Sequence, residues 1–485
     1  TLIHNAVPWE PPDESTKEPG RYFEDRTFVP VRLAKAITLH ASMNGEAYVF
    51  GMDPDSGGGR LMQYSKGVWR PAVGVQVEAH CRLKDCSTPA RLVATERILT
   101  VDVDQVPWSQ WNKERLLINC RNGMLDAKTL ELLPHDRGYM STMQIPVRWN
   151  PAADYGPVRD WLAQMLPADC ITLVQSMLGY FMTASVVVKS IFVLEGDGDT
   201  GKTTLLYVVQ ELVGEENFEI IEMHDLADNR FATARLENKL LGLYDDLQCS
   251  RLSDTSVLKV LTGGSEQLVV ERKCQDAYTA PLFAKLLYSC NVMPTAPDKS
   301  SAWYSRCVIV PMTNVIPKGD QIPDLKDKLT TVAALEGLFR FAAEGLQALI
   351  ANDMRLPDTK TVKQKREEYE VKSDTVLAFV RGGCELGNPA ETAIRKTAWY
   401  DCYWRWCAAM GLRYPSGKMR AYERLLQIQG VVESRHGPAG TRVFKGIQVS
   451  AAGHAEIEAA KDAQQRSLRG WGSRYPSEPL TASRN

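Results

Sequence analysis

The sequence predicts an α/β protein built on a parallel sheet, with a small α+β domain before the sheet and a helix–helix–hairpin unit after it. Residues 188–312 alternate apolar strands with helical stretches, a pattern that favours a parallel sheet. Residues 196–203 read GDGDTGKT and join an apolar strand to a helical stretch. Residues 396–449 contain two helical stretches and then two strands with a turn between them, the outline of a winged helix.

These patterns divide the chain into seven segments. In order they are an irregular lead-in at 1–30, a small α+β domain at 31–150, a collar-like helical segment at 151–186, the sheet-bearing core at 187–320, a helical segment at 321–385, a winged-helix domain at 386–452 and a polar tail at 453–485 whose end we expect to be flexible. A length of 485 residues exceeds one core of ordinary size, which agrees with several domains.

Composition and the chain's start narrow the class of protein. Apolar content is 44% and charged content 24%, as in soluble globular proteins, and no run approaches the ~20 apolar residues of a membrane span. The first residues, TLIHNAVPWEPP, lack the pattern of a signal peptide. They also lack an initiator Met, which suggests a processed product or a fragment of a longer parent. Eleven scattered cysteines favour free thiols in a reducing cytoplasm.

The elements before the sheet are predicted from local patterns. Short apolar runs between turn signals indicate the α+β domain, and RILTVDV (97–103) is predicted as one of its strands. Residues 151–186 have apolar residues at three- and four-residue spacing, which predicts helix, with Pro167 as a break.

The glycine-rich loop fits the spacing G-x-x-x-x-G-K-[ST] in the context that phosphate binding requires. SIFVLE (190–195) before it is strand-like, and TTLLYVVQELVG (203–214) after it is helical. Glycines let backbone N–H groups surround phosphate oxygens, and the helix N-terminus adds its positive end. Lys202 would reach the β- and γ-phosphates of ATP, and Thr203 would place its hydroxyl on Mg²⁺. The predicted cofactor-binding residues are Gly196, Asp197, Gly198, Asp199, Thr200, Gly201, Lys202, Thr203 and Thr204.

Polar residues end the next two predicted strands. KLLGLYDD (239–246) closes on Asp245, assigned to the metal, and Asp246, assigned to the attacking water, although the two roles can be exchanged. KLLYSCN (285–291) closes on Asn291. This side chain is predicted to hold the water or contact the γ-phosphate, and the alternative is an ordinary turn residue.

A single arginine precedes the last predicted strand of the core. WYSRCVIVPM (303–312) places Arg306 where its side chain can reach a neighbouring subunit's γ-phosphate. A surface salt bridge is the alternative role.

Together these motifs resemble those of superfamily 3 helicases, in particular the phage, plasmid and poxvirus primase-helicase group. The most distinctive piece is VLKVLTGG (257–264) followed by the basic residues Arg272 and Lys273. Where this group usually has Asp after the glycine pair, this chain has Ser265. The resemblance extends over roughly residues 40–450.

The resemblance implies an AAA+-like ATPase that forms a ring, usually a hexamer, with DNA in the central channel. Lys202, Thr203, Asp245, Asp246 and Asn291 would then act in their own subunit. Arg306 would act on a neighbouring subunit's nucleotide. The implied DNA contacts are Arg272, Lys273 and Lys259. The implied function is a replicative DNA helicase, translocating 3′ to 5′ along one strand, for a phage, plasmid or other mobile element in the bacterial cytoplasm.

Charge restricts how such a chain can bind DNA. The formal net charge is −2, whereas proteins that coat duplex DNA usually have a strong basic excess. We therefore expect local contacts in a pore, a hairpin or a small appended domain. ILTVDVD (98–104) suggests the paired aspartates of a primase, but no further motif supports it. A primase is expected in a longer parent or as a separate partner.

Three alternatives remain. An origin-binding initiator would read DNA through the winged helix, although winged helices also dock proteins. The residues for that role are Lys418, Arg420, Arg424, Arg435 and Arg442. A P-loop kinase would explain the glycine-rich loop but not the later motifs. A zinc site is weakly suggested by His80, Cys81 and Cys86, which lack a second ligand pair at finger-like distance, and Cys402 and Cys407 are predicted as buried thiols.

Overall fold

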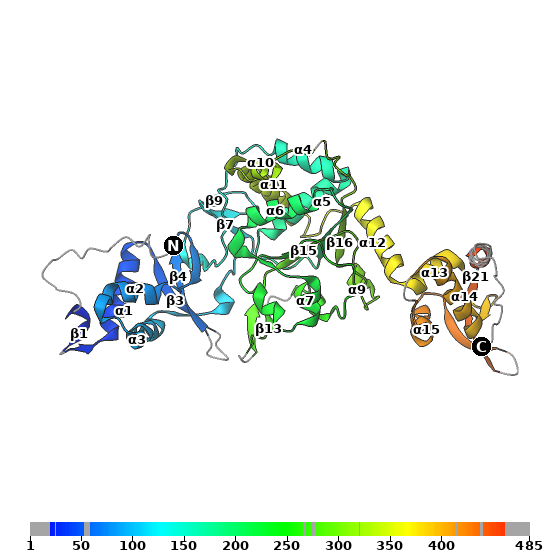
Figure 1. The fold of residues 1–485 in the computed structure, drawn as a ribbon, viewed down its shortest axis with the longest axis horizontal. Coiled ribbons are helices and arrows are strands. Elements are labelled where there is room, and N and C mark those ends of the chain that lie inside the picture. Colours follow the sequence, from blue (N-terminus) through cyan, green and yellow to red (C-terminus); the bar gives the residue numbers. More distant parts are fainter. Residues whose placement is uncertain are drawn as a thin grey trace, which may run out of the picture. The chain divides into compact units, whose positions relative to one another are not determined.

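The computed structural model describes residues 20–24, 26–52, 59–264, 267–273, 277–319, 321–412, 415–436 and 440–460 (Figure 1). The chain separates into two compact units, Thr1–Lys365 and Arg366–Asn485. The predicted lead-in up to residue 19, the predicted tail beyond residue 460 and Ser265 lie outside the described residues. Among the helices that are described, none combines the length and the apolar character needed to cross a bilayer.

The first unit begins with helices packed on a small mixed sheet. The helices are α1 (Pro30–Met43), α2 (Val75–Leu83) and α3 (Pro89–Asp102). The sheet has the order β5-β4-β3-β6, from β3 (Ala47–Met52), β4 (Gly59–Ser65), β5 (Val68–Pro71) and β6 (Gln105–Pro107). Buried apolar side chains of all three helices, among them Ile37, Ala79 and Leu99, form the core of this region. A two-stranded ladder, β1 (Phe23–Glu24) and β2 (Thr27–Phe28), precedes it.

The predicted strand at 97–103 is wrong, because residues 97–102 form the last turns of α3 and Val103 follows the helix. Thr88 caps the helix by accepting a hydrogen bond from the Arg91 N–H, and Pro89 occupies its first turn. Thr95 and Leu99 are fully buried at i, i+4 spacing. Asp102 and Asp104 of the primase-like stretch therefore do not lie on a strand.

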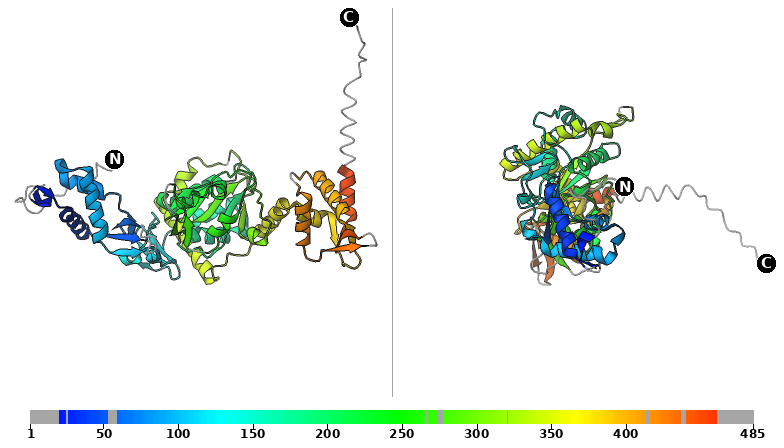
Figure 2. Two further views of the ribbon diagram at one scale, coloured as in Figure 1. Left: turned by 90° about the horizontal axis from the view of Figure 1, so that it is seen from below. Right: turned by 90° about the vertical axis from the view of Figure 1, so that its left-hand side faces the viewer.

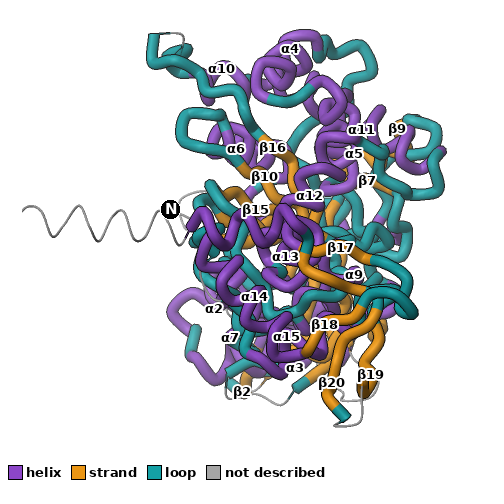
Figure 3. Tube along the Cα trace, turned by 90° about the vertical axis from the view of Figure 1, so that its right-hand side faces the viewer, coloured by secondary structure: helices purple, strands orange, loops and turns teal. Residues whose placement is uncertain are grey.

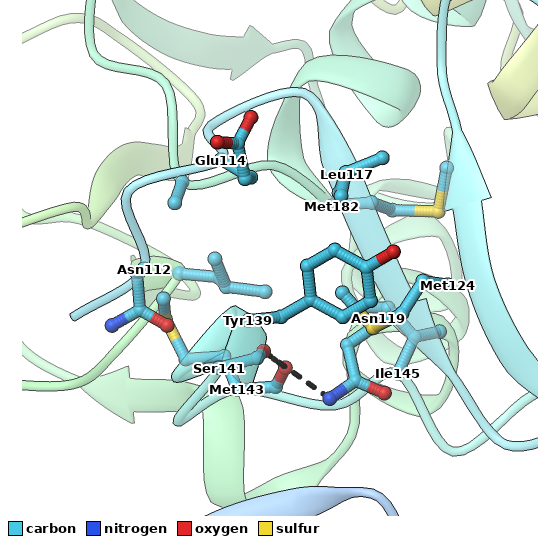
Figure 4. Close-up of a pocket in the computed structure, with 12 residues that line it drawn as sticks. Asn112, Glu114, Leu117, Asn119, Met124, Tyr139, Ser141, Met143, Ile145 and Met182 are labelled. Carbon is cyan, nitrogen blue, oxygen red and sulfur yellow. Dashed lines mark hydrogen bonds between the residues drawn. The ribbon is translucent and has the colours of Figure 1, made fainter. Parts of the chain in front are cut away.

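A second small sheet connects this region to the core. It is antiparallel with the order β7-β8-β9, from β7 (Leu117–Cys120), β8 (Gly123–Asp126) and β9 (Leu132–Leu133). A cavity of about 20 Å³ lies beside it, and Asn119 there donates a hydrogen bond to Ser141 (Figure 4). This volume accommodates about one water molecule, so the cavity is too small for a substrate.

The centre of the first unit is a five-stranded parallel sheet with the order β11-β12-β15-β10-β16. Its strands are β10 (Ile191–Glu195), β11 (Phe218–Ile220), β12 (Leu241–Tyr244), β15 (Lys285–Cys290) and β16 (Cys307–Pro311). The neighbouring helices are α4 (Gly156–Met165), α5 (Ile171–Phe181), α6 (Lys202–Val213), α7 (Met223–Asp228), α8 (Ser256–Leu261), α9 (Ser301–Tyr304), α10 (Leu325–Leu329) and α11 (Val332–Ala351). Helices surround this sheet in two views (Figures 1 and 2). The parallel sheet and the helix break at Pro167 are as predicted.

A hairpin leaves the sheet-bearing core between α8 and β15. Its antiparallel strands are β13 (Gln267–Val270) and β14 (Tyr278–Pro281). Arg272 and Lys273 lie in the connection between the two strands. The predicted basic residues are therefore at the outer end of this hairpin.

The second unit begins within α12 (Lys360–Ser373), a helix that spans the division between the units. It contains α13 (Thr375–Gly383), α14 (Lys396–Ala409), α15 (Lys418–Leu426), the pair β17 (Cys384–Leu386) and β21 (Ile447–Val449), and the sheet β18-β20-β19 from β18 (Ala393–Arg395), β19 (Val432–His436) and β20 (Thr441–Lys445). Figure 3 labels α14 and α15 beside these strands. Trp399, Tyr403, Phe379 and Phe444 fill the core with ring contacts. Helices and a hairpin thus occur where the sequence predicts them.

Lys285, the first residue of β15, is a buried lysine. Its side chain is in the core, where its Nζ donates to the Thr183 carbonyl and lies 5.0 Å from the Tyr180 ring centroid. Burial, with a smaller contribution from the nearby Arg115, lowers the pKa of Lys285 well below its ordinary value. The charged form is therefore disfavoured in the folded chain relative to the unfolded one.

We expect replacement of Lys285 by Met to change how stability depends on pH. Between the lowered pKa and the ordinary lysine pKa, the unfolded wild-type chain binds more protons than the folded one, so its free energy of unfolding rises with pH. The Lys285→Met chain lacks this rise. The wild-type melting temperature should therefore increase relative to the variant from about pH 7 to about pH 10. Exchange of the exposed Lys35 for Met is the control, and an equal difference at every pH would contradict the prediction.

Candidate functional site

The glycine-rich loop connects the central strand β10 to α6. Gly201, the residue before α6, has φ +87°, and a Cβ there would lie 2.2 Å from the Met165 sulfur. Both facts favour glycine at this position. Thr200 Oγ1 donates to the Asp197 carbonyl at 2.9 Å, and the Ile316 N–H donates to the Asp199 carbonyl at 2.9 Å. The loop is therefore held by its own hydrogen bonds and by the segment after β16.

Lys202 makes three hydrogen bonds that close the loop. Its Nζ donates to the carbonyls of Gly196 at 2.6 Å and Asp197 at 2.7 Å, and to Asn291 Oδ1 at 3.2 Å. The lysine is 9% exposed. An ammonium group has three donors, and all three have acceptors here. The structure thus brings together two residues, Lys202 and Asn291, that the sequence predicted separately.

The predicted acidic residues lie at the end of β12, beside the end of β15. Ser289 Oγ donates to Asp245 Oδ1 and accepts from the Asp246 N–H at 2.9 Å. Asp245 is half-buried and Asp246 is exposed. Ser289 could not be predicted as a site residue, because a serine inside an apolar strand has no special pattern. Beside it, Cys290 is a neutral thiol, since burial and the nearby Glu195 raise its pKa to about 12.

The sequence analysis also did not predict Glu195, a buried carboxylate, as part of the site. Glu195 ends β10 directly before the loop, is 9% exposed, and forms an ion pair with Lys365 Nζ at 3.0 Å. The sequence does contain an indication of this residue, because Glu195 is a charged residue at the end of the apolar run IFVLE. Its partner on α12 is far away in the sequence and could not be found from it.

A cavity of about 480 Å³ opens beside the loop. It is lined from three directions, by Trp161 and Met165 of α4, by Gly201 and Thr204, and by the segment after β16, including Ile322. Thr203 is exposed on the first turn of α6. This volume is in the range of small-molecule sites.

Arg306 lies at the opposite end of the strands from the glycine-rich loop. Register pairs Ile191 with Cys307 and Glu195 with Pro311, so Arg306 is beside the start of β10, whereas the loop follows its end. Five residues of strand separate the two positions by about 16 Å. Arg306 Nη1 donates to the Ala302 carbonyl at 2.6 Å. Its Nε is buried without a hydrogen-bond partner among the described residues.

Two of the three predicted DNA contacts, Lys259 and Arg272, already have partners in this structure. Lys259 lies on α8, which precedes the hairpin, and its Nζ is 2.7 Å from Asp298. Burial raises the pKa of Asp298, but hydrogen bonds from Lys259 and Ser300 outweigh this effect and lower it to about 2. Arg272 pairs with Glu237, and Lys273 is exposed. Among the residues the structure describes, no three His, Cys, Asp or Glu side chains are grouped to hold a metal ion.

Comparisons with known proteins bear on two segments. Residues 194–306 match a family of unknown function, DUF5906, and residues 76–167 match the family described as D5 N terminal like. The first match covers the loop, both acidic residues, Asn291 and Arg306. Together the two matches support a phage primase-helicase family and confirm the resemblance seen in the motifs.

Three solved structures of the NrS-1 C-terminal region are also similar. The A form apo structure is 12% identical, with 85% of this chain and 98% of that chain covered and a TM-score of 0.48. A second A form apo structure (305-718) is 13% identical, with 84% and 88% covered and a TM-score of 0.47. The apo structure (305-718) is 12% identical, with 86% and 98% covered and a TM-score of 0.46. At this sequence identity and TM-score, the similarity carries no information about the residues of the candidate site.

Two glycines in the loop should respond differently to alanine. Gly201→Ala combines an unfavourable left-handed backbone with a clash against Met165, whereas a Cβ at Gly198 meets nothing within 4 Å. We expect Gly201→Ala to lower the melting temperature by about 5 °C. Gly198→Ala should leave it unchanged. Thermal unfolding of both variants checks this, and equal shifts would contradict the structure of the loop.

Proposed function

We propose that the chain is an ATP-dependent DNA helicase that works as a ring in the replication of a phage, plasmid or other mobile element. The observation that carries this proposal is the grouping of Lys202, Asn291 and Asp245 at one edge of the parallel sheet, with Arg306 at the opposite edge. One subunit then supplies the nucleotide site, and its neighbour supplies the arginine.

The residues present fit ATP and Mg²⁺. The loop Gly196–Thr204 would surround the phosphates, with Lys202 exchanging its carbonyl contacts for phosphate oxygens. Thr203 and Asp245 would hold Mg²⁺, which neutralises phosphate charge. Asp246 and Asn291 would position the attacking water. The cavity of about 480 Å³ beside Gly201 and Thr204 has room for the adenosine.

The position of Arg306 supports action between subunits. It is about 16 Å from the end of β10 in its own chain, so it does not reach its own loop. In a ring, the side of one subunit that carries Arg306 would lie against the nucleotide site of the next subunit. We therefore assign the first unit's core to the AAA+-like class and expect a hexamer.

DNA would pass through the ring and contact the hairpin. Lys273 is exposed at the outer end of this hairpin, next to Arg272. A chain of net charge −2 can still bind a strand if several subunits place such residues in one channel. Movement 3′ to 5′, and a primase in a longer parent or as a separate partner, complete the proposal.

A second role, duplex recognition by an origin-binding initiator, is favoured by the charge of the second unit. Residues 393–445 carry ten Lys and Arg against three Asp and Glu. On the hairpin β19–β20, Arg435 and Arg442 are exposed and directly opposite each other. Like charges directly opposite each other destabilise a sheet. A bound anion, such as a DNA phosphate, would relieve the repulsion between the two arginines. Arg424 is less suited, because its Nε is 2.5 Å from the buried Asp374.

ATP hydrolysis by paired variants tests the ring. Lys202→Ala and Arg306→Ala should each abolish DNA-stimulated hydrolysis and strand displacement. Mixed in equal amounts, they should recover about a quarter of the wild-type rate, because one interface in four then combines an intact lysine with an intact arginine. Hydrolysis that is normal in Arg306→Ala alone, or no recovery in rings assembled from both variants together, would contradict the trans role.

The double variant Arg435→Ala/Arg442→Ala tests the second unit. We expect weaker binding to duplex DNA, with the slope of log affinity against log salt reduced by about 2, because two phosphate contacts are lost. Arg381→Ala, which removes an arginine of α13, is the control. An unchanged salt slope in the double variant would favour a protein partner for this hairpin.

A further inference from the structure

A single carboxylate, Glu237, joins three parts of the first unit. It lies between the 3-10 helix η7 (Ala232–Leu236) and β12. Its Oε1 is 3.2 Å from Arg60 Nη2 of β4, and its Oε2 accepts from the Tyr278 hydroxyl at 2.6 Å. The same Oε2 accepts from Arg272 Nη2. The glutamate therefore connects the first small sheet, the hairpin and the start of β12.

The cluster around Glu237 holds more positive than negative charge. Two guanidinium groups, of Arg60 and Arg272, share one carboxylate, and the exposed Lys273 follows directly. The Arg272 guanidinium also lies 5.3 Å from the Tyr278 ring centroid. Glu237 is 11% exposed, whereas Arg60 is 32% and Arg272 36% exposed. The arginines thus keep faces toward solvent while the carboxylate is largely covered.

A second ion pair near the hairpin behaves differently. Arg230 and Glu271 pair one to one at 3.2 Å, with exposed fractions of 71% and 37%. Their charges cancel, and pairs this exposed contribute little to stability. The excess of positive charge around Glu237 is therefore not shared by this neighbouring ion pair.

We propose that Glu237 is a positioning residue that occupies the arginines in place of a DNA phosphate. A carboxylate that accepts from two guanidinium groups and a phenol offers the acceptors that a phosphate offers. In the absence of DNA it holds Arg60 and Arg272 in place and reduces their attraction for other anions. A strand in contact with Lys273 displaces it. This inference rests on the proposed function, because it requires a DNA strand at the hairpin.

Single-stranded DNA affinity, measured without nucleotide, tests the role of Glu237. Glu237→Gln keeps the size of the side chain but removes the charge that competes with phosphate. We expect it to bind a labelled oligothymidylate about threefold to tenfold more tightly than wild type, with a steeper salt dependence. Glu219→Gln is the matched control, because Glu219 pairs one to one with Arg235 and lies outside the cluster. It should bind like wild type.

Two further variants separate charge from structure. Tyr278→Phe removes a hydrogen bond to Glu237 but no charge, so its affinity should stay at the wild-type level. In Glu237→Gln/Arg60→Ala the gain should be lost. Equal or weaker binding by a folded Glu237→Gln, or the same gain in Tyr278→Phe, would overturn the proposal. If the wild type itself does not bind the oligonucleotide, the proposed function fails instead.

Discussion

The parallel direction of the central strands is the constraint on which the candidate site depends. Because β10, β12 and β15 run the same way, the residues that follow them meet at one edge of the sheet. The loop, Asp245 and Asn291 are neighbours for this reason alone. For the same reason Arg306, which precedes β16, lies at the opposite end of the strands. The hairpin precedes the start of β15. The sheet therefore separates two sets of polar groups that a proposed ring would bring together again.

Much of this arrangement could be predicted because it depends on neighbours in the sequence. A strand, a glycine-rich loop and a helix follow one another, and Asp245 and Asn291 each end an apolar strand. The contacts that complete the site are long-range. Lys365 reaches Glu195 from a helix 170 residues later. Outside the site, Arg60 reaches Glu237 from another sheet in the same way. Hydrophobic periodicity holds no information about such pairs, so only the folded chain shows them.

The error at 97–103 has a physical cause of the same kind. Ile, Thr and Val have side chains that favour strands, and the stretch contains Ile98, Thr100, Val101 and Val103. The start of the helix lies outside the stretch, at the Thr88 cap, and burial of Leu99 in the core with α1 and α2 fixes the outcome. Tertiary packing thus overrode a local preference. No comparable competition exists at the loop, where glycine geometry and sequence pattern agree.

The contacts of Lys202 also restrict what Asn291 can do in the proposed reaction. An ammonium group only donates, so Asn291 must turn its oxygen toward Lys202 and its amide N–H groups elsewhere. It can therefore orient a water or a phosphate oxygen by donation. Proton acceptance falls to the carboxylates at the end of β12. Asp245 already accepts from Ser289, whereas Asp246 is exposed, which favours the assignment of Asp245 to the metal and Asp246 to the water.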